Sequence, residues 1–183
     1  MKKQILERYP RNSDGSFTIE ISTDKVQYLF NNFDRFAPYV RKELDQDLVD
    51  YLTDCVRELE NEKILIQFQI NETVDANLME RIKTSIQNYF LYLKELEIIQ
   101  LKNMGRRFMI FLIIGFSILT LSVWVNDNLD RVSALNRVLS EGLTVAAWVS
   151  LWEAVSTFLI NWSPHKSRIK CYEKIAEAPV IFV

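Results

Sequence analysis

Hydrophobic and polar residues alternate in two short stretches of the chain, Ser16 to Ser22 and Lys63 to Ile70. A repeat of two residues is typical of a strand with one face buried. The buried faces would be formed by Phe17, Ile19 and Ile21, and by Ile64, Ile66, Phe68 and Ile70. Between the two strands, apolar residues recur every three or four positions from Arg41 to Glu60, which predicts a helix packed on the sheet.

A second, longer helical pattern begins near Thr73. Its buried face would contain Leu78, Ile82, Ile86, Tyr89, Phe90 and Leu93. No proline or glycine interrupts it before Gly105, so we expect this helix to run on into the apolar segment that follows.

Near the C-terminus, Ser167 to Ala176 has the pattern of a short helix, and Pro179 to Val183 is apolar enough to need burial. We expect this last run to form a third strand beside the other two. The predicted fold class is therefore a small three-stranded α+β domain with a two-helix transmembrane hairpin inserted before its last helix and strand.

Two segments have almost no charge. Phe108 to Val125 supplies about 18 uncharged residues, which span roughly 27 Å as a helix and match the apolar core of a bilayer. Arg106, Arg107 and Trp124 flank it as interfacial anchors. The second segment carries Glu141 and Glu153, so a half-buried amphipathic helix competes with a second crossing there. We favour the crossing, because the first helix needs a return path and Pro164 would end the second.

These boundaries divide the chain into three parts. Residues 1–105 form the first part of the α+β domain, residues 106–163 the hairpin, and residues 164–183 the helix and strand that complete the domain. Within the hairpin, the helices would cover about 106–125 and 139–162, with a loop at Asn126 to Arg137.

Basic residues flank the outer ends of the hairpin. They are Lys102, Arg106 and Arg107 before it, and Lys166, Arg168, Lys170 and Lys174 after it. Because positive residues concentrate on the cytoplasmic side, we expect a multi-pass protein of the inner (plasma) membrane with both termini in the cytoplasm.

Composition argues against several classes of function. A net charge of −2 gives no sign of a nucleic-acid partner. Cys55 and Cys171 lack metal-ligand or redox spacing and are expected to be reduced core thiols, and His165 is the single histidine. We therefore predict no catalytic residue, no metal site and no cofactor, and we expect a protein that is not an enzyme.

Glu153 is the sharpest candidate for function in the hairpin. A charge at the centre of a membrane helix costs about 2.5–3.5 kcal/mol, and no Lys, Arg or His lies inside either segment to offset it. Helical spacing puts Gly142, Ala146 and Ser150 on its face, and Gly115 and Ser122 offer a matching seam on the first helix. Three interpretations stay open: a neutral Glu153 that hydrogen-bonds between helices, a Glu153 that faces water in an oligomeric channel, and a shallower position.

Glu141, Trp148 and Trp152 complete this candidate set. The two tryptophans lie one turn apart and would pack against a partner helix or lipid. A second set lies in the connection after the first strand, where Arg35, Phe36 and Tyr39 could either staple the loop onto the core or dock a partner.

Four segments of the chain resemble a group of uncharacterised small bacterial membrane proteins with two transmembrane helices and a cytoplasmic α+β domain. They are Phe33 to Asp45, Ile86 to Tyr92, Glu141 to Trp152 and Tyr172 to Val180. The resemblance covers nearly the whole chain but implies no activity, so it assigns no functional residue.

From these observations we expect a non-enzymatic integral membrane protein that oligomerises through its hairpin and presents a cytoplasmic domain to a partner. The alternative is a subunit of an oligomeric pore or channel, or a membrane-perturbing effector, with Glu153 facing the pathway. The expected partners are the lipid bilayer, further copies of the chain and an unidentified cytoplasmic protein.

Overall fold

The computed structural model describes residues 5–60, 62–128 and 134–183, and it has a mixed α+β fold. The chain divides into two compact units. One comprises Met1–Leu96 with Arg168–Val183, and the other comprises Glu97–Ser167. We call them the α+β unit and the hairpin unit.

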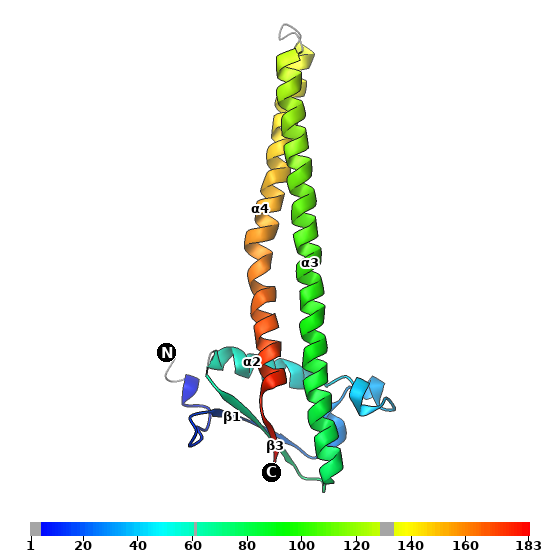
Figure 1. Ribbon diagram of the computed structural model, residues 1–183, viewed down its shortest axis with the longest axis vertical. Helices are drawn as coiled ribbons and strands as arrows, with labels where there is room; N and C mark the ends of the chain where they lie inside the picture. Colours follow the sequence, from blue (N-terminus) through cyan, green and yellow to red (C-terminus); the bar gives the residue numbers. More distant parts are fainter. Residues whose placement is uncertain (1–4, 61, 129–133) are drawn as a thin grey trace. The chain divides into compact units, whose positions relative to one another are not determined.

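The α+β unit is built on a three-stranded sheet, β1 (Phe17–Thr23), β2 (Ile64–Ile70) and β3 (Val180–Phe182). The strands lie in the order β1-β2-β3 and are all parallel, with Ile19 beside Ile66 and Ile66 beside Val180 (Figure 1). The two alternating stretches and the apolar C-terminal run are thus confirmed as strands. The third pairs with β2 alone, which makes β2 the central strand.

Helix α2 (Gln46–Leu59) connects β1 to β2, as a crossover between parallel strands requires. The prediction that it begins at Arg41 is wrong. Asp45 caps the helix by accepting a hydrogen bond from the Asp47 backbone N–H at 3.0 Å, and Tyr39–Arg41 forms a separate 3₁₀ turn. Two further 3₁₀ turns, Val26–Leu29 and Asn32–Asp34, lie between β1 and α2.

One face of the sheet carries the core of the α+β unit. Ile19, Ile66 and Phe68 are fully buried, and Phe68 stacks on Phe182 with ring centroids 5.6 Å apart. Helix α3 (Ala76–Asn128) contributes a fully buried stripe, and helix α4 (Ala134–Glu177) contributes Ile175. The α3 stripe consists of Ile82, Ile86 and Phe90, three of the six positions predicted; Leu78, Tyr89 and Leu93 are partly buried against it.

Pro164 does not end a helix, contrary to the sequence-based prediction. Helix α4 continues through it to Glu177, so the separate helix predicted for Ser167 to Ala176 is the last part of α4. A proline inside a helix removes one backbone hydrogen bond. The contact between His165 and Glu97, one residue further on, holds α4 against α3 at that point.

In the hairpin unit, α3 and α4 run antiparallel. The contacts along them pair Phe108 with Phe158, at 5.3 Å between ring centroids, and the Ser122 hydroxyl with the Thr144 hydroxyl, at 2.8 Å. The helices also extend further than predicted, α3 to Asn128 and α4 from Ala134, so most of the predicted loop is helical. Residues 129–133 of that loop lie outside the described part of the chain.

Candidate functional site in the helical hairpin

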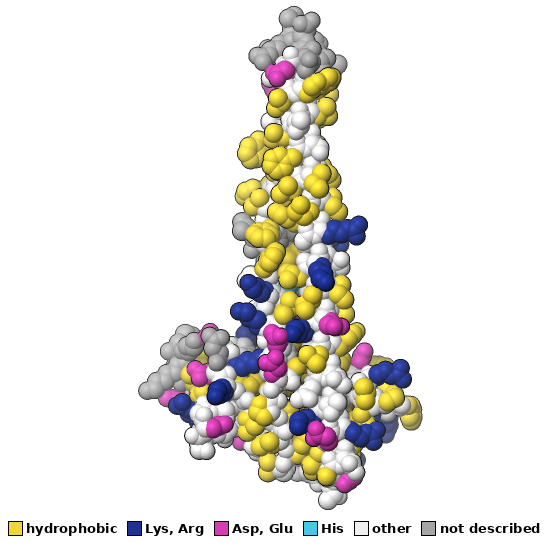
Figure 2. Space-filling view, in the orientation of Figure 1, with side chains coloured by type: hydrophobic (Ala, Val, Ile, Leu, Met, Phe, Trp, Pro, Cys, Tyr) yellow, Lys and Arg dark blue, Asp and Glu magenta, His cyan; other side chains and the backbone are white. Residues whose placement is uncertain are grey.

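The outer surface of the hairpin unit is apolar. Figure 2 shows hydrophobic side chains crowded along the upper part of the hairpin, while Lys and Arg side chains gather further down. Large side chains on both helices are at least half exposed, among them Ile113, Phe116, Trp124, Trp148 and Trp152. Both α3 and the Val138–Ser156 part of α4 are long and apolar enough to cross a membrane, and only 11% of each apolar span is buried.

The seam between the two helices is formed by small and hydroxyl-bearing residues. Ala147 and Ala154 are 0% and 1% exposed, and a Cβ added to Gly115 would lie 2.8 Å from the Leu151 side chain. The Ser122 hydroxyl forms a hydrogen bond with the Thr144 hydroxyl at 2.8 Å, and it also lies 3.2 Å from the Ser140 backbone carbonyl, to which it can donate. Small residues at a seam let two backbones approach closely.

The α4 side of this seam is a different face from the one expected. Gly115 and Ser122 meet Leu151 and Thr144, whereas Gly142, Ala146 and Glu153 are exposed. The face of α4 that carries Glu153 is therefore left uncovered by α3. The spacing of Ala147, Leu151, Ala154 and Phe158, alternately four and three residues, is the signal that would have identified the true seam.

The pairing of the helices also fixes the level of Glu153 along the hairpin. Gly115 lies opposite Leu151 and Phe108 opposite Phe158, so Glu153 lies level with Ile113. Six residues, or about 9 Å of helix rise, separate that level from Arg107. Glu153 thus lies between the centre of the apolar span and its basic end, which favours the shallower of the positions considered above.

Glu153 and Arg107 line a single hollow of about 720 Å³ in the hairpin unit. Its other described lining residues are polar at one end and apolar beside Glu153: Gln100, Asn103, His165, Met104, Ile110 and Phe111. The sequence placed no cation within reach of Glu153, because Arg107 belongs to the other helix and becomes a neighbour only through the antiparallel pairing.

His165, for which the sequence suggested no role, is held at the lower end of this hollow. Its Nδ1 atom lies 2.5 Å from Oε2 of Glu97, whose side chain is 8% exposed. Because Glu97 engages Nδ1, Nε2 is the ring nitrogen left for other hydrogen bonds.

The other hairpin candidates lie on the exposed surface. Trp148 and Trp152 are 64% and 72% exposed, so neither packs into the seam. Glu141 is exposed and lies twelve residues from Glu153, about 18 Å along α4. Of these candidates, Glu153 shares a hollow with Arg107, about 9 Å of helix rise from its level, and with His165, which lies about 18 Å away along α4 at the other end; Glu141 does not line it.

In the α+β unit, Tyr39 and Phe36 have different environments. Tyr39 packs edge-on against Phe30, with ring centroids 5.5 Å apart, and lies under the cations of Lys42 and Arg81 at 4.8 Å each. Phe36 is 98% exposed, so of the two predicted staples only Tyr39 packs on the core. Arg35 donates to the Gln27 side chain at 3.5 Å.

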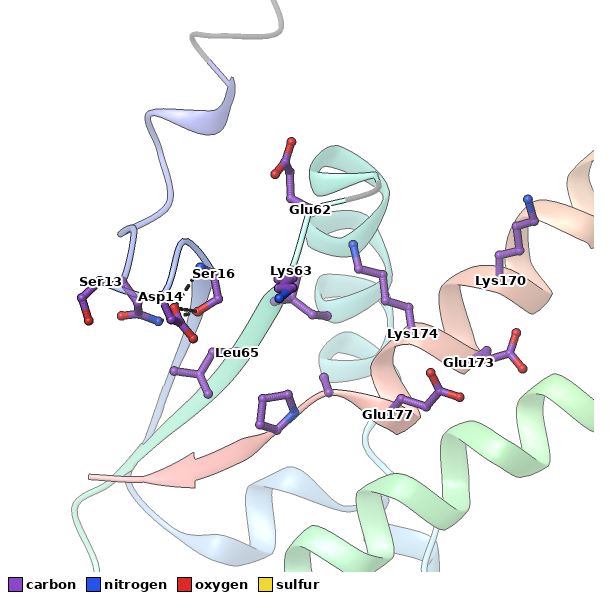
Figure 3. Close-up of a pocket in the computed structure, with 14 residues that line it drawn as sticks. Ser13, Asp14, Ser16, Glu62, Lys63, Leu65, Lys170, Glu173, Lys174 and Glu177 are labelled. Atoms are coloured by element: carbon purple, nitrogen blue, oxygen red, sulfur yellow. Dashed lines mark hydrogen bonds between the residues drawn. The ribbon is translucent and has the colours of Figure 1, made fainter.

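A second hollow, of about 810 Å³, lies at the amino ends of the strands (Figure 3). Its described lining includes three lysines and four carboxylates: Lys63, Lys170, Lys174, Asp14, Glu62, Glu173 and Glu177. Hydrogen bonds from Ser16 lower the pKa of Asp14, and Lys174 donates to the Glu60 carbonyl at 2.6 Å. Mixed charges of this kind favour no single class of ligand, and ligands of open parallel sheets bind at the opposite, carboxyl ends of the strands.

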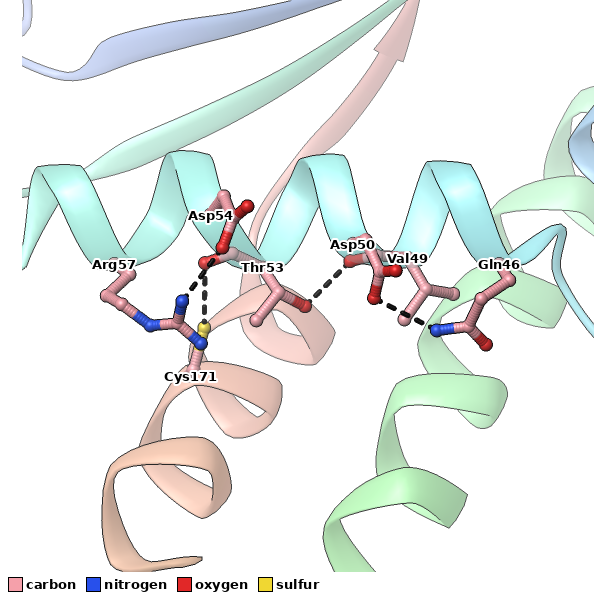
Figure 4. Close-up of polar contacts among 7 residues, drawn as sticks. All are labelled: Gln46, Val49, Asp50, Thr53, Asp54, Arg57 and Cys171. Carbon is pink, nitrogen blue, oxygen red and sulfur yellow. Dashed lines mark hydrogen bonds and ion pairs between the residues drawn. The ribbon is translucent and has the colours of Figure 1, made fainter. Parts of the chain in front are cut away.

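Both cysteines are free and buried in the α+β unit. Cys171 donates a weak hydrogen bond to the Thr53 carbonyl at 3.5 Å (Figure 4), and burial raises the pKa of its thiol to about 11. A thiol in this state is a poor nucleophile.

No protein-family model, curated protein or solved structure matches this chain. The arrangement of its own residues is therefore the basis for a functional proposal.

Proposed function

We propose that this chain is an integral membrane protein whose α3 and α4 cross the bilayer as a hairpin. Copies of the chain assemble through the exposed face of α4, and the α+β unit is presented to a partner on the cytoplasmic side. The observation that carries this proposal is the exposure of large apolar side chains on two helices whose seam is already filled.

Burial in a bilayer accounts for this surface. Full burial of one large apolar side chain is worth about 1.5–3 kcal/mol, so an exposed surface with Ile113, Phe116 and Trp152 is costly in water. Lipid removes that cost without any change in the fold. The α+β unit, in contrast, buries most of its large apolar side chains in its own core, with Phe33 and Phe36 as exposed exceptions.

The basic residues support a cytoplasmic position for both ends of the hairpin. The antiparallel pairing places Arg106 and Arg107 of α3 at the same end of the hairpin unit as Lys166 of α4. The sequence from 126 to 137, at the opposite end, contains two basic residues, Arg131 and Arg137, beside Asp127 and Asp130, fewer basic residues than the first end. By the positive-inside rule, the first end faces the cytoplasm of a plasma membrane.

The exposed face of α4 supports assembly. Gly142 and Ala146 permit close approach of a helix from a second copy, and Glu153 offers a strong hydrogen-bonding group about two to three turns further on. Trp148 and Trp152 add large exposed rings beside this stripe. The exposed Phe36 next to Arg35 is the surface on which a cytoplasmic partner would dock.

A pore is the second candidate function, and the position of Glu153 favours it. Ala147 and Ala154 fill the seam of the single hairpin, so a conducting path has to form between copies. Glu153 lies on the exposed side of α4, where such a path would run.

The test begins with alkaline carbonate extraction of membranes and the mass of the detergent-solubilised protein. We expect the chain to stay in the membrane pellet and to have the mass of an oligomer. Glu153→Gln should keep the oligomer and Glu153→Leu should weaken it, while Glu141→Leu, the matched control, should leave it unchanged.

Release from the membrane by carbonate would overturn the membrane proposal, and a strict monomer would overturn assembly. Equal assembly of both Glu153 variants would show that the carboxyl does not hold the copies together. Ion flux in liposomes that is lost on Glu153 substitution would favour the pore over passive assembly.

A further inference from the structure

The hollow that contains Glu153 is elongated along the hairpin. Its lining begins at Gln100 on α3 and reaches the level of Ile113, where Glu153 lies on α4. That distance is thirteen residues, or about 20 Å of helix rise. In the proposed bilayer position, Gln100 and Asn103 lie outside the apolar span on its basic side, and Glu153 lies inside the span, level with Ile113 and five residues from its start at Phe108.

Five of the eight described lining residues are polar, so hydrocarbon is a poor filling for the end of this hollow near Gln100, while Ile110 and Phe111 border it beside Glu153. Gln100, Asn103, Arg107, Glu153 and His165 all border it. Polar groups that face acyl chains lose their hydrogen bonds to water, and a charged one in the span costs about 2.5–3.5 kcal/mol. At about 30 Å³ per molecule, a volume of about 720 Å³ holds on the order of twenty waters.

We propose that this hollow is a water-filled vestibule, open at the cytoplasmic end of the hairpin, that gives the Glu153 carboxyl access to protons from that side only. The described lining of the hollow reaches no further toward the outer end of the hairpin than the level of Glu153, so we place its closed inner end there. The inference rests on the proposed membrane location and on the assembly interpretation; access to Glu153 from both sides would favour the pore instead.

The charged groups around the vestibule have separate parts in it. Arg107 borders the hollow from α3, about 9 Å of helix rise from the level of Glu153, and its long side chain reaches toward water at the basic end. His165 borders the mouth, where Glu97 fixes its ring through Nδ1. The described titratable or charged groups at this site are Arg107, Glu97, Glu153 and His165. Of these, Glu153 lies at the inner end.

Cysteine accessibility in sealed vesicles tests the vestibule directly. Glu153→Cys is compared with Val149→Cys, which lies one turn further along the same face of α4 and is 64% exposed in the single chain. The probe is a charged methanethiosulfonate reagent, which reacts with hydrated thiolates. We expect Glu153→Cys in inside-out vesicles to react at least about tenfold faster than Val149→Cys, because the thiolate is the reactive form and needs water.

The native cysteines serve as internal controls. Cys55 and Cys171 are buried, so the intact mass should show one added label and not three. A second substitution checks that the hollow persists in Glu153→Cys and that the reagent reaches the thiol through it. Asn103→Trp fills the mouth of the vestibule, and adding it to Glu153→Cys should slow labelling about tenfold. Arg106→Trp, three residues further along α3 and outside the described lining, should not slow it.

Each result has a distinct meaning. Slow labelling of Glu153→Cys in a chain that resists carbonate extraction would overturn the vestibule and leave the membrane proposal intact. Labelling from the outer side as fast as from the cytoplasmic side would overturn one-sided access. Fast labelling of both cysteine variants from either side would overturn the membrane location, and the vestibule with it.

Discussion

The α+β unit and the hairpin unit place their large apolar side chains in opposite ways. In the first, Ile66, Phe68 and Phe90 are fully buried, and charged residues occupy the surface. In the second, the described buried residues are small or polar, namely Gly115, Ser122, Ala147, Ala154 and Glu97, while tryptophans and isoleucines point outward. This difference indicates that the surfaces of the two units fit different solvents. The surface of the α+β unit fits water and, in our proposal, the surface of the hairpin fits lipid.

Helix α3 shows the change within a single element. Its first part buries Ile82, Ile86 and Phe90 at intervals of four residues. Its later part exposes Ile113 and Phe116 by more than half, and only small or partly buried residues face α4. The helix is continuous across this change from buried to exposed apolar residues, so the change lies in the side chains and not in the backbone.

The largest expected effect is on the core of the α+β unit. Phe68→Ala removes a fully buried ring that stacks on Phe182, and we expect it to lower the free energy of unfolding by about 3–5 kcal/mol. Hydrogen exchange of the full chain in detergent should show lost protection in β2 and unchanged protection in the hairpin. Phe36→Ala, at a ring that is 98% exposed, is the control. Equal loss of protection in both units would show that they unfold as one.

Pro164→Ala tests the continuity of α4. Proline inside a helix is up to about 3 kcal/mol less favourable than alanine, so we expect the variant to be more stable by up to that amount. Thermal unfolding followed by circular dichroism measures the change. Destabilisation would mean that the chain needs a break in α4 at this position.

Cys171 provides a pH-dependent comparison, because its thiol belongs to the α+β unit. Burial raises the pKa of the folded thiol from the ordinary 9.0 to about 11, so the folded state holds its proton more tightly than the unfolded state. The resulting stability is fully present below pH 9 and is lost as the pH rises from 9 to 11. Near pH 8, alkylation of native Cys171 should be about a hundredfold slower than that of the unfolded chain, since the thiolate fraction falls tenfold per pKa unit. Rapid alkylation without unfolding would contradict the buried position.

Replacing either of two glycines of α3 with alanine should change stability, in opposite directions. Gly115→Ala forces a methyl group to 2.8 Å from the Leu151 side chain and 3.3 Å from its backbone nitrogen, which we expect to cost about 1–3 kcal/mol. Gly105→Ala meets no atom within 4 Å and should stabilise the helix by up to about 1 kcal/mol. Unfolding in detergent micelles, followed by circular dichroism, compares the two. A change in stability of the same sign in both variants would argue against the close contact of Gly115 with Leu151 in the seam.

The sequence predicted an element correctly where the pattern of that element's own residues determines its local structure. Alternation at Phe17, Ile19 and Ile21 predicted β1, because a buried strand face repeats every two residues. It left the parallel direction open, since parallel and antiparallel strands share that repeat. The proline rule failed at Pro164, because the local loss of one hydrogen bond is outweighed by contacts on either side of it, including that of His165 with Glu97.

For the candidate site, Glu153 could be singled out but its surroundings could not. Its neighbours depend on which residue of α3 lies opposite each residue of α4, and that register is set by the contact of Gly115 with Leu151. The register brings Arg107 to the same hollow and moves Glu153 toward the basic end of the span. Spacing along one helix contains no information about the other, so this part of the site needed the structure.

The smallest expected effect concerns a single hydrogen bond in the seam. The hydroxyls of Ser122 and Thr144 lie 2.8 Å apart, and polar pairs between membrane helices contribute about 0.6 kcal/mol on average. A double-mutant cycle of Ser122→Ala and Thr144→Ala, followed by unfolding in micelles, should give a coupling of that size. Ser117, whose hydroxyl bonds to the Ile113 carbonyl of its own helix, should show no coupling to Thr144. A coupling of about 2 kcal/mol or more would indicate that polar contacts, rather than close packing at Gly115 and Ala147, hold the two helices together.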